Sequence, residues 1–182
     1  YNVRTYATNS AGTVYGNQQS FTTTVSIGDS YQGGIVAYIL QPGDPGYDPN
    51  VQHGLVAAPS DQSASVEWGC ISTEISGADG TAIGTGSQNT LDILNGCSTL
   101  GIAAKICNDL VLNGYSDWYL PSIDELRKLY ENRNSIGGFT DKFYWSSSEN
   151  NSVYVWSIDF YYGNQGVDSK SFTYFVRAIR SF

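Results

Sequence analysis

The segment GYSDWYLPSIDELRKLY, residues 114–130, carries the clearest structural signals in the chain. Its apolar segment Trp118–Leu120 predicts a short strand that runs directly into a helix. Ser122 and Glu125 have the spacing of a capping box, in which each residue satisfies a free backbone N–H at a helix start. The residues at helical spacing that we expect to be buried are Ile123, Leu126, Leu129 and Tyr130.

Outward from this helix, the chain predicts strands on both sides of a helical middle. A second helix is predicted over Thr99–Leu112, and the Gly-rich and Ser-rich residues 68–88 predict loops. The predicted strands are Ile35–Leu40, Leu55–Ala58, Phe143–Ser147, Val153–Phe160 and Phe172–Ile179. Strands, then helices, then strands indicate an α+β domain with two helices, small antiparallel sheets and long loops.

Residues 1–24 predict two strands joined by a turn. Two strands cannot bury a core alone, so we expect an appendage and place the main domain at residues 25–182. The segment YNVRTYATNSAGTVYGNQQSFTT resembles the last hairpin of a fibronectin type III domain. This resemblance implies that residues 1–24 are the remnant of a preceding module.

Composition excludes several classes of partner. The net charge of −8 argues against nucleic acid, whose phosphates bind clustered Lys and Arg, and no apolar run is long enough to insert into a membrane. Of the three cysteines, Cys107 lies on the apolar face of the predicted helix. Cys70 and Cys97 lie in turn-like sequences and could form one disulfide, which favours a location outside the cytoplasm.

The titratable residues form no catalytic constellation. His53 is the only histidine, and no motif supplies it with a nucleophile or an orienting group, so we interpret it as structural. Asp117, Asp124 and Glu125 could be read as an acid cluster. The helix cap explains Glu125, and the positive end of the helix dipole explains Asp124.

Asp44 and Asp48 lie in the loop QPGDPGYDPN and could hold a structural calcium ion. Calcium takes six to eight oxygen ligands, usually with several carboxylates, and only two are near. A solvated acidic loop is therefore favoured over a calcium site. No other cofactor is predicted.

Residues 144–182 have a different composition from the rest of the chain. Between YWSSSE and VRAIRSF, the sequence mixes Tyr, Ser, Asp, Gly and Phe without a clean period. Tyr offers a large contact area at low entropic cost, and Ser and Gly adapt their hydrogen bonding, as in antibody combining sites. This composition predicts a binding surface with exposed aromatic residues.

Several blocks of sequence together resemble one family. They are IGDSYQGGIVAYIL, QHGLVAAPSDQS, GYSDWYLPSIDELRKLY, YWSSSE and VRAIRSF. Over about residues 25–182 they are similar to the Lcl C-terminal-type domain, a branch of the C-type lectin-like fold. The resemblance implies small twisted sheets, two helices and long loops that present a ligand surface. The calcium-dependent sugar motifs EPN, QPD and WND are absent from the sequence, so that mechanism is not expected.

The C-terminal frame also resembles the variable region of diversity-generating retroelement proteins, in which template adenines are randomised. A randomised asparagine codon cannot encode Lys, Gln, Glu, Met or Trp, and in this region such types occur only at Trp145, Glu149, Trp156, Gln165 and Lys170. The non-frame positions among and just after these residues are predicted to form the ligand surface. They are Val153, Tyr154, Val155, Ser157, Ile158, Asp159, Tyr161, Tyr162, Gly166, Val167, Asp168, Ser169, Ser171, Phe172, Thr173 and Tyr174.

The sequence therefore predicts a non-enzymatic binding domain with a diversified surface at about residues 153–175. Its expected partner is a protein or glycan receptor on another cell or surface, and its expected location is extracellular, on a bacterial surface or a phage virion. One alternative is an adhesin or carbohydrate-binding module of fixed specificity. The other is an enzyme of the formylglycine-generating type, which shares the fold and would require a reactive, accessible cysteine pair.

Overall fold

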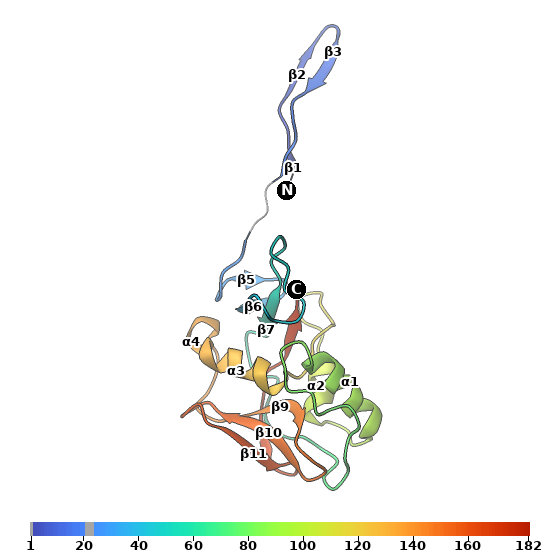
Figure 1. Ribbon diagram of the computed structural model, residues 1–182, viewed down its shortest axis with the longest axis vertical. Helices are drawn as coiled ribbons and strands as arrows, with labels where there is room; N and C mark the ends of the chain where they lie inside the picture. Colours follow the sequence, from blue (N-terminus) through green and yellow to red (C-terminus); the bar gives the residue numbers. More distant parts are fainter. Residues whose placement is uncertain (1, 21–23) are drawn as a thin grey trace.

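Two small β-sheets form the frame of the domain in the computed structural model, which describes residues 2–20 and 24–182 (Figure 1). The larger sheet has the strand order β11-β10-β9-β12-β8, and all its pairs are antiparallel except β9 with β12. Its strands are β8 (Ser63–Glu67), β9 (Phe143–Glu149), β10 (Tyr154–Asp159), β11 (Gln165–Ser169) and β12 (Thr173–Val176).

The second sheet is antiparallel and has the order β13-β7-β6-β5. Its strands are β5 (Ser30–Tyr31), β6 (Gly34–Ile39), β7 (Gly54–Ala57) and β13 (Ile179–Ser181). The predicted strand Trp118–Leu120 contributes one bridge, from Tyr119 to Ile179. Arg177 and Ala178 separate β12 from β13, so the predicted strand Phe172–Ile179 passes from one sheet to the other.

Four helices lie within the described residues, where two were predicted. They are α1 (Gly86–Gly96), α2 (Ala103–Asn108), α3 (Ile123–Glu131) and α4 (Arg133–Ile136). Helix α3 begins with the predicted capping box of Ser122 and Glu125. The α+β class is confirmed, and the number of helices is corrected.

Helix α1 escaped prediction because its buried face is partly polar, with Ile93 as its only fully buried apolar side chain. Asn89 and Thr90 are buried there, and their side chains donate to the carbonyl oxygens of Gly80 (2.6 Å) and Gly86 (2.8 Å). Hydrogen bonding thus replaces the apolar stripe by which a buried helix face is usually recognised.

The helix predicted over Thr99–Leu112 is shorter than expected. Leu100 is 85% exposed, so it does not belong to the buried stripe. Gly101 has a positive φ of 68°, which is incompatible with a continuous α-helix, and α2 starts only after it. Apolar periodicity therefore overestimated the length of this helix.

The core consists of two clusters of buried apolar side chains. Successive residues of β9 enter different clusters: Trp145 belongs to one and Tyr144 to the other. The alternation of side chains along a strand produces this division, because neighbours point to opposite faces of the sheet. Helix α3 contributes Ile123, Leu126 and Leu129 to the cluster of Tyr144.

The N-terminal segment forms the predicted hairpin, with β2 (Tyr6–Asn9) paired to β3 (Gly12–Tyr15) and β1 (Asn2–Val3) paired to β4 (Gln19–Ser20). Every residue from 3 to 18 is exposed. The ends of the predicted strands at residues 1 and 21–23 lie outside the described residues. The assignment to a fibronectin type III remnant stays a prediction.

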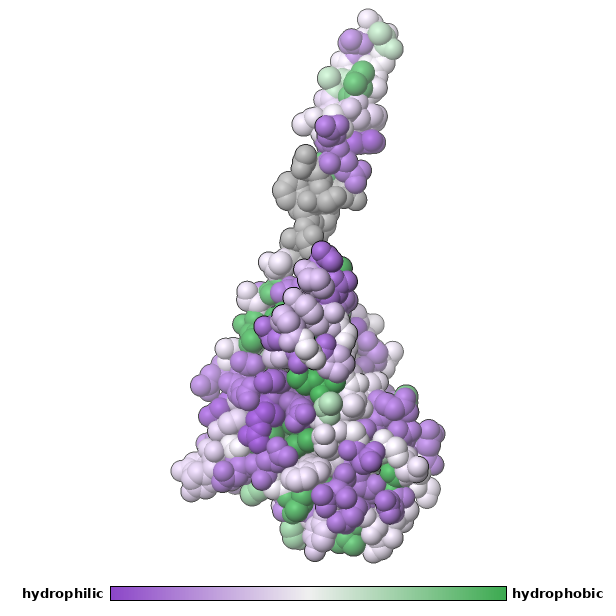
Figure 2. All heavy atoms as spheres, in the orientation of Figure 1, coloured by the Kyte–Doolittle hydropathy of each residue, from purple (hydrophilic) through white to green (hydrophobic). Residues whose placement is uncertain are grey.

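The surface of the domain is mostly hydrophilic on the face shown in Figure 2, with apolar residues in small separate groups. None of the helices in the described ranges is long and apolar enough to cross a bilayer.

Candidate ligand-binding surface

The buried serines of β9 fix this strand to its neighbours. Ser146 donates through its hydroxyl to the carbonyl oxygen of Trp156 on β10 (2.6 Å). The hydroxyl of Ser148 donates to the Gly80 carbonyl (2.7 Å) and accepts from the backbone N–H of Ile123 (3.0 Å), the first residue of α3. The buried serines of YWSSSE therefore link β9 by hydrogen bonds to a strand, a loop and a helix.

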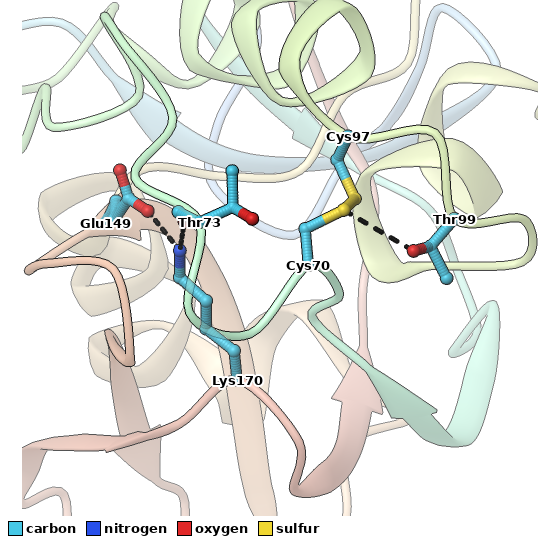
Figure 3. The surroundings of a disulfide bond; sticks show 6 residues. All are labelled: Cys70, Thr73, Cys97, Thr99, Glu149 and Lys170. Carbon is cyan, nitrogen blue, oxygen red and sulfur yellow. Dashed lines mark hydrogen bonds and ion pairs between the residues drawn. A yellow bond between two sulfur atoms is a disulfide. The ribbon is translucent and has the colours of Figure 1, made fainter.

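A buried ion pair closes the base of the segment that contains β10 and β11. Glu149 ends β9, Lys170 directly follows β11, and their side chains form an ion pair in which both are buried (Figure 3). Lys170 also donates to the Thr73 carbonyl (2.7 Å), and Glu149 accepts from the backbone N–H of Ile75 (2.8 Å). Two residues of the predicted frame thus join the ends of the predicted surface segment.

Cys70 and Cys97 form a disulfide, with their Cα atoms 5.7 Å apart. The pairing suggested by the sequence is confirmed. Cys107 is a free, buried thiol whose pKa is raised by burial, as expected for a small apolar core residue.

The two arginines of VRAIRSF form ion pairs just after β12 and within β13. Arg177 is buried and donates to the Asp61 carboxylate (2.8 Å). Arg180 donates to both carboxylate oxygens of Asp117 (2.7 and 2.8 Å), and these hydrogen bonds lower the pKa of Asp117. Asp117 is therefore a structural ion-pair partner.

The remaining acidic candidates near α3 belong to its first turn. Glu125 accepts from the backbone N–H groups of Ser122 (2.8 Å) and Gly84 (2.9 Å). Burial raises the pKa of Glu125, while these donors act in the opposite direction. Asp124 is exposed at the helix start, where the dipole favours a negative charge.

His53 and the acidic loop have structural partners. His53 lies just before β7, with Nδ1 3.1 Å from the carbonyl oxygen of Phe182. Asp44 accepts from the Tyr38 hydroxyl (2.7 Å), and burial together with this carboxylate raises the pKa of Tyr38 to about 12. Asp48 accepts from the backbone of Asn50 (2.8 Å). Residues 2–20 and 24–182 hold no group of three His, Cys, Asp or Glu side chains that could bind a metal.

The residues predicted to form the ligand surface divide by burial. The exposed residues are Tyr154, Tyr161, Tyr162, Val167, Ser171, Phe172 and Thr173. The half-buried residues are Val153, Asp159, Gly166, Asp168, Ser169 and Tyr174. The buried residues are Val155, Ser157 and Ile158.

The three buried residues correct the prediction, because they cannot contact a ligand in this structure. Val155 and Ile158 belong to the two core clusters. Ser157 lies beneath the surface and donates to Asp168 on the paired strand (2.5 Å). The sequence alone does not give the register of β10 with β9. These inward-facing positions were therefore assigned to the ligand surface.

An aromatic cluster lies near the end of the segment. The ring of Tyr174 lies 4.3 Å from that of buried Trp145 and stacks on Phe143 at 5.0 Å between centroids. Phe172, 50% exposed, lies beside Tyr174 at 6.1 Å. Burial, together with the Asp168 carboxylate that accepts from its hydroxyl, raises the pKa of Tyr174 to about 12. Phe143 was not among the residues predicted to form the ligand surface. Its position next to Tyr144 indicates that the two side chains point to opposite faces of β9.

A second aromatic pair occupies the turn between β10 and β11. The rings of Tyr161 and Tyr162 meet edge to face at 4.4 Å, and Tyr162 is 70% exposed. Arg127 of α3 donates to the Gly163 carbonyl (2.6 Å) and to the Gln165 side chain (3.1 Å). A residue of the predicted frame, Gln165, thus anchors the turn that carries these tyrosines.

The strands β9, β10 and β11 lie at the end of the domain opposite β5, β6 and β7 (Figure 1). Residues 59–180, which include this end, match the family model of the Lcl C-terminal domain. The chain belongs to the Lcl C-terminal domain family.

The Lcl C-terminal domain of this chain is also similar to a solved structure, a fimbrial protein from Bacteroides ovatus. The two share 16% sequence identity with a TM-score of 0.55, over 80% of this chain and 43% of that one. This similarity shows the fold alone, and the chain spans less than half of the fimbrial protein's length. No curated protein matches the sequence.

Proposed function

We propose that this Lcl C-terminal domain is a non-enzymatic receptor-binding module whose segment 153–175 forms a diversified binding surface, as in diversity-generating retroelement variable proteins. Its partner is a protein or glycan receptor on another cell or surface. The domain acts outside the cell, on a bacterial surface or a phage virion.

The observation that carries the proposal is the division of the segment into anchoring and exposed residues. Lys170 and Glu149 are buried in an ion pair, Trp145 is a core residue, and Gln165 binds Arg127. These are residue types that a randomised asparagine codon cannot produce. Of the sixteen positions predicted to form the ligand surface, three are buried and the other thirteen are exposed or half-buried. A surface can therefore change while its anchors remain.

The exposed residues suit recognition of a large partner. Tyr154, Tyr161, Tyr162 and Phe172 offer rigid aromatic area, which dominates the energetics of many interfaces. Two carboxylates, Asp159 and Asp168, and several serines supply hydrogen-bonding groups around them. The structural similarity to a fimbrial protein supports display on a cell surface.

The cysteines give no support to the formylglycine-generating alternative. That chemistry needs a reactive pair of accessible thiols. Cys70 and Cys97 are joined to each other, and Cys107 is buried with a raised pKa that keeps its thiol protonated.

The proposal is tested by selection from two displayed libraries. One randomises the exposed positions Tyr154, Tyr161, Tyr162, Val167 and Phe172 together. The matched control randomises five exposed positions elsewhere on the domain: Ile71, Leu91, Leu100, Asp109 and Val111. We expect folded, specific binders to a panel of unrelated proteins to arise from the first library much more often than from the second. Equal yields from both would contradict the proposal.

An adhesin or carbohydrate-binding module of fixed specificity is the second candidate, because the similar solved structure is a fimbrial protein. A glycan array distinguishes it from the diversified module. Binding to one glycan that survives exchange of all five exposed positions would favour a fixed site elsewhere on the domain. Loss of that binding would place the site on the segment.

A further inference from the structure

The loop Gly69–Ala78 contacts both ends of the segment that carries the proposed surface. At the first end, Glu149 donates its backbone N–H to the Ala78 carbonyl (2.7 Å), and its carboxylate accepts from the Ile75 N–H (2.8 Å). At the second end, Lys170 donates to the Thr73 carbonyl (2.7 Å) (Figure 3). This loop therefore bridges the two strand ends from outside the sheet.

Further backbone contacts extend the bridge along the segment. Ser72 donates its N–H to the carbonyl of Ser152, just before β10 (2.8 Å). Gly69 donates to the carbonyl of Lys170 (3.4 Å). The position of the segment's base thus depends on the position of the loop.

The first half of the loop has few stabilising contacts apart from these hydrogen bonds. Residues 71–74 are exposed and belong to no helix or strand. Cys70 and Ser72 have positive φ angles of 47° and 68°, a left-handed conformation that side chains disfavour. Such a backbone persists only where surrounding contacts impose it. Here the disulfide to Cys97 supplies a covalent contact at the start of the loop.

We propose that the Cys70–Cys97 disulfide is a redox-sensitive positioning element of the binding surface. It holds the loop Gly69–Ala78, which in turn holds Glu149 and Lys170 and keeps the base of β10 and β11 closed. An external dithiol breaks the sulfur–sulfur bond, transfers two electrons and two protons to give two cysteine thiols, and is itself oxidised to a cyclic disulfide. The reduced domain keeps its core but loses the ordered surface.

The effect on ligand binding rests on the proposed function, whereas the effect on the segment does not. Hydrogen exchange of the full chain, followed by mass spectrometry with and without dithiothreitol, measures the second effect directly. We expect amides of residues 150–176 to exchange about tenfold faster after reduction, because their local opening becomes easier. Amides of β6, β7 and α3 should be unchanged.

Two hydrogen-exchange results would each overturn the proposal. One is unchanged exchange at residues 150–176 after complete reduction, and the other is equal acceleration throughout the domain. The double variant Cys70→Ala/Cys97→Ala is the matched control: it should exchange like the reduced protein and show no response to dithiothreitol. If that variant does not fold, the proposal is overturned, because the disulfide then holds the whole domain.

The same readout separates this proposal from the proposed function. Accelerated exchange in the segment, combined with no binders from the library of exposed positions, would retain the positioning role and reject the diversified surface. Binders whose affinity is insensitive to dithiothreitol would retain the surface and reject the positioning role.

Discussion

Two hairpins in this chain have similar compositions and very different environments. The N-terminal pair β2 and β3 carries Tyr6 and Tyr15, and each of its residues is exposed. The pair β10 and β11 also displays tyrosines, but Val155, Ser157 and Ile158 of β10 are buried beneath them. A Tyr-rich hairpin therefore forms a stable surface only where other side chains of its strands enter a core and an interaction fixes the strand ends.

The largest expected effect comes from breaking the Glu149–Lys170 ion pair at the base of the second hairpin. Lys170→Met leaves the buried Glu149 carboxylate without its cationic partner, and the free energy of unfolding should fall by about 3–5 kcal/mol. Urea unfolding measures it. The matched control is Lys105→Met in the exposed pair with Asp109, which should cost less than about 1 kcal/mol. Equal losses would show that the buried pair does not hold the hairpin.

A somewhat smaller effect on stability is expected from a buried residue of β10, and it can be compared with an exposed residue of the turn that follows. Ile158→Ala removes a fully buried side chain and should lower the free energy of unfolding by about 2–5 kcal/mol. Tyr161→Ala, at an exposed position of the turn, should change it by about 0.5 kcal/mol or less. Thermal or urea unfolding of both variants checks the contrast, and a similar cost for both would remove the distinction between frame and surface.

A pH dependence is expected from the Asp117–Arg180 ion pair of β13, which lies in the other sheet from the second hairpin. Hydrogen bonds from Arg180 lower the pKa of Asp117, so the folded state holds this carboxylate ionised more strongly than the unfolded state does. The resulting stabilisation is present above the unfolded pKa of about 4 and is lost as pH falls through the lower, folded value. Asp117→Asn should therefore be less stable than the parent at neutral pH and show a shallower loss in acid. An unchanged acid limb would contradict this.

The smallest effect is expected at the first hairpin. A chain beginning at Thr24 should unfold with a free energy within about 0.5 kcal/mol of the parent value, because residues 3–18 bury nothing against the domain. Differential scanning calorimetry of the two chains provides the measurement. A clear loss of stability in the shortened chain would mean that the N-terminal hairpin is part of the folded unit.

The parts of the fold that could be predicted are those in which apolar spacing or local capping decides the structure. The Ser122–Glu125 cap of α3 and the strands β6, β7, β9 and β10 follow from such local patterns. Helix α1 could not be predicted, because Ile93 is the only large apolar side chain buried on it, and the buried Asn89 and Thr90 are satisfied by distant carbonyl groups.

The site was predicted less completely than the fold, for a related reason. Composition indicated that at least half of the aromatic residues Tyr154, Tyr161, Tyr162, Phe172 and Tyr174 would be exposed. All of them are exposed except Tyr174, which is half-buried. Which members of β10 turn inward depends on its register with β9, where a bulge lies between Val155 and Ser157. The partner of Lys170 could not be predicted for the same reason. Glu149 is distant from it in sequence, and only the fold brings the two charges together.

The division of residues 143–182 into a fixed frame and a free surface is tested most directly by a saturation scan read out by protease resistance of displayed variants. We predict that Tyr154, Tyr161, Tyr162, Val167 and Phe172 accept nearly every residue type. Val155, Ile158, Lys170 and Arg177 should accept few. Equal intolerance at the exposed positions would show that the whole segment serves the fold and would contradict a surface free to vary.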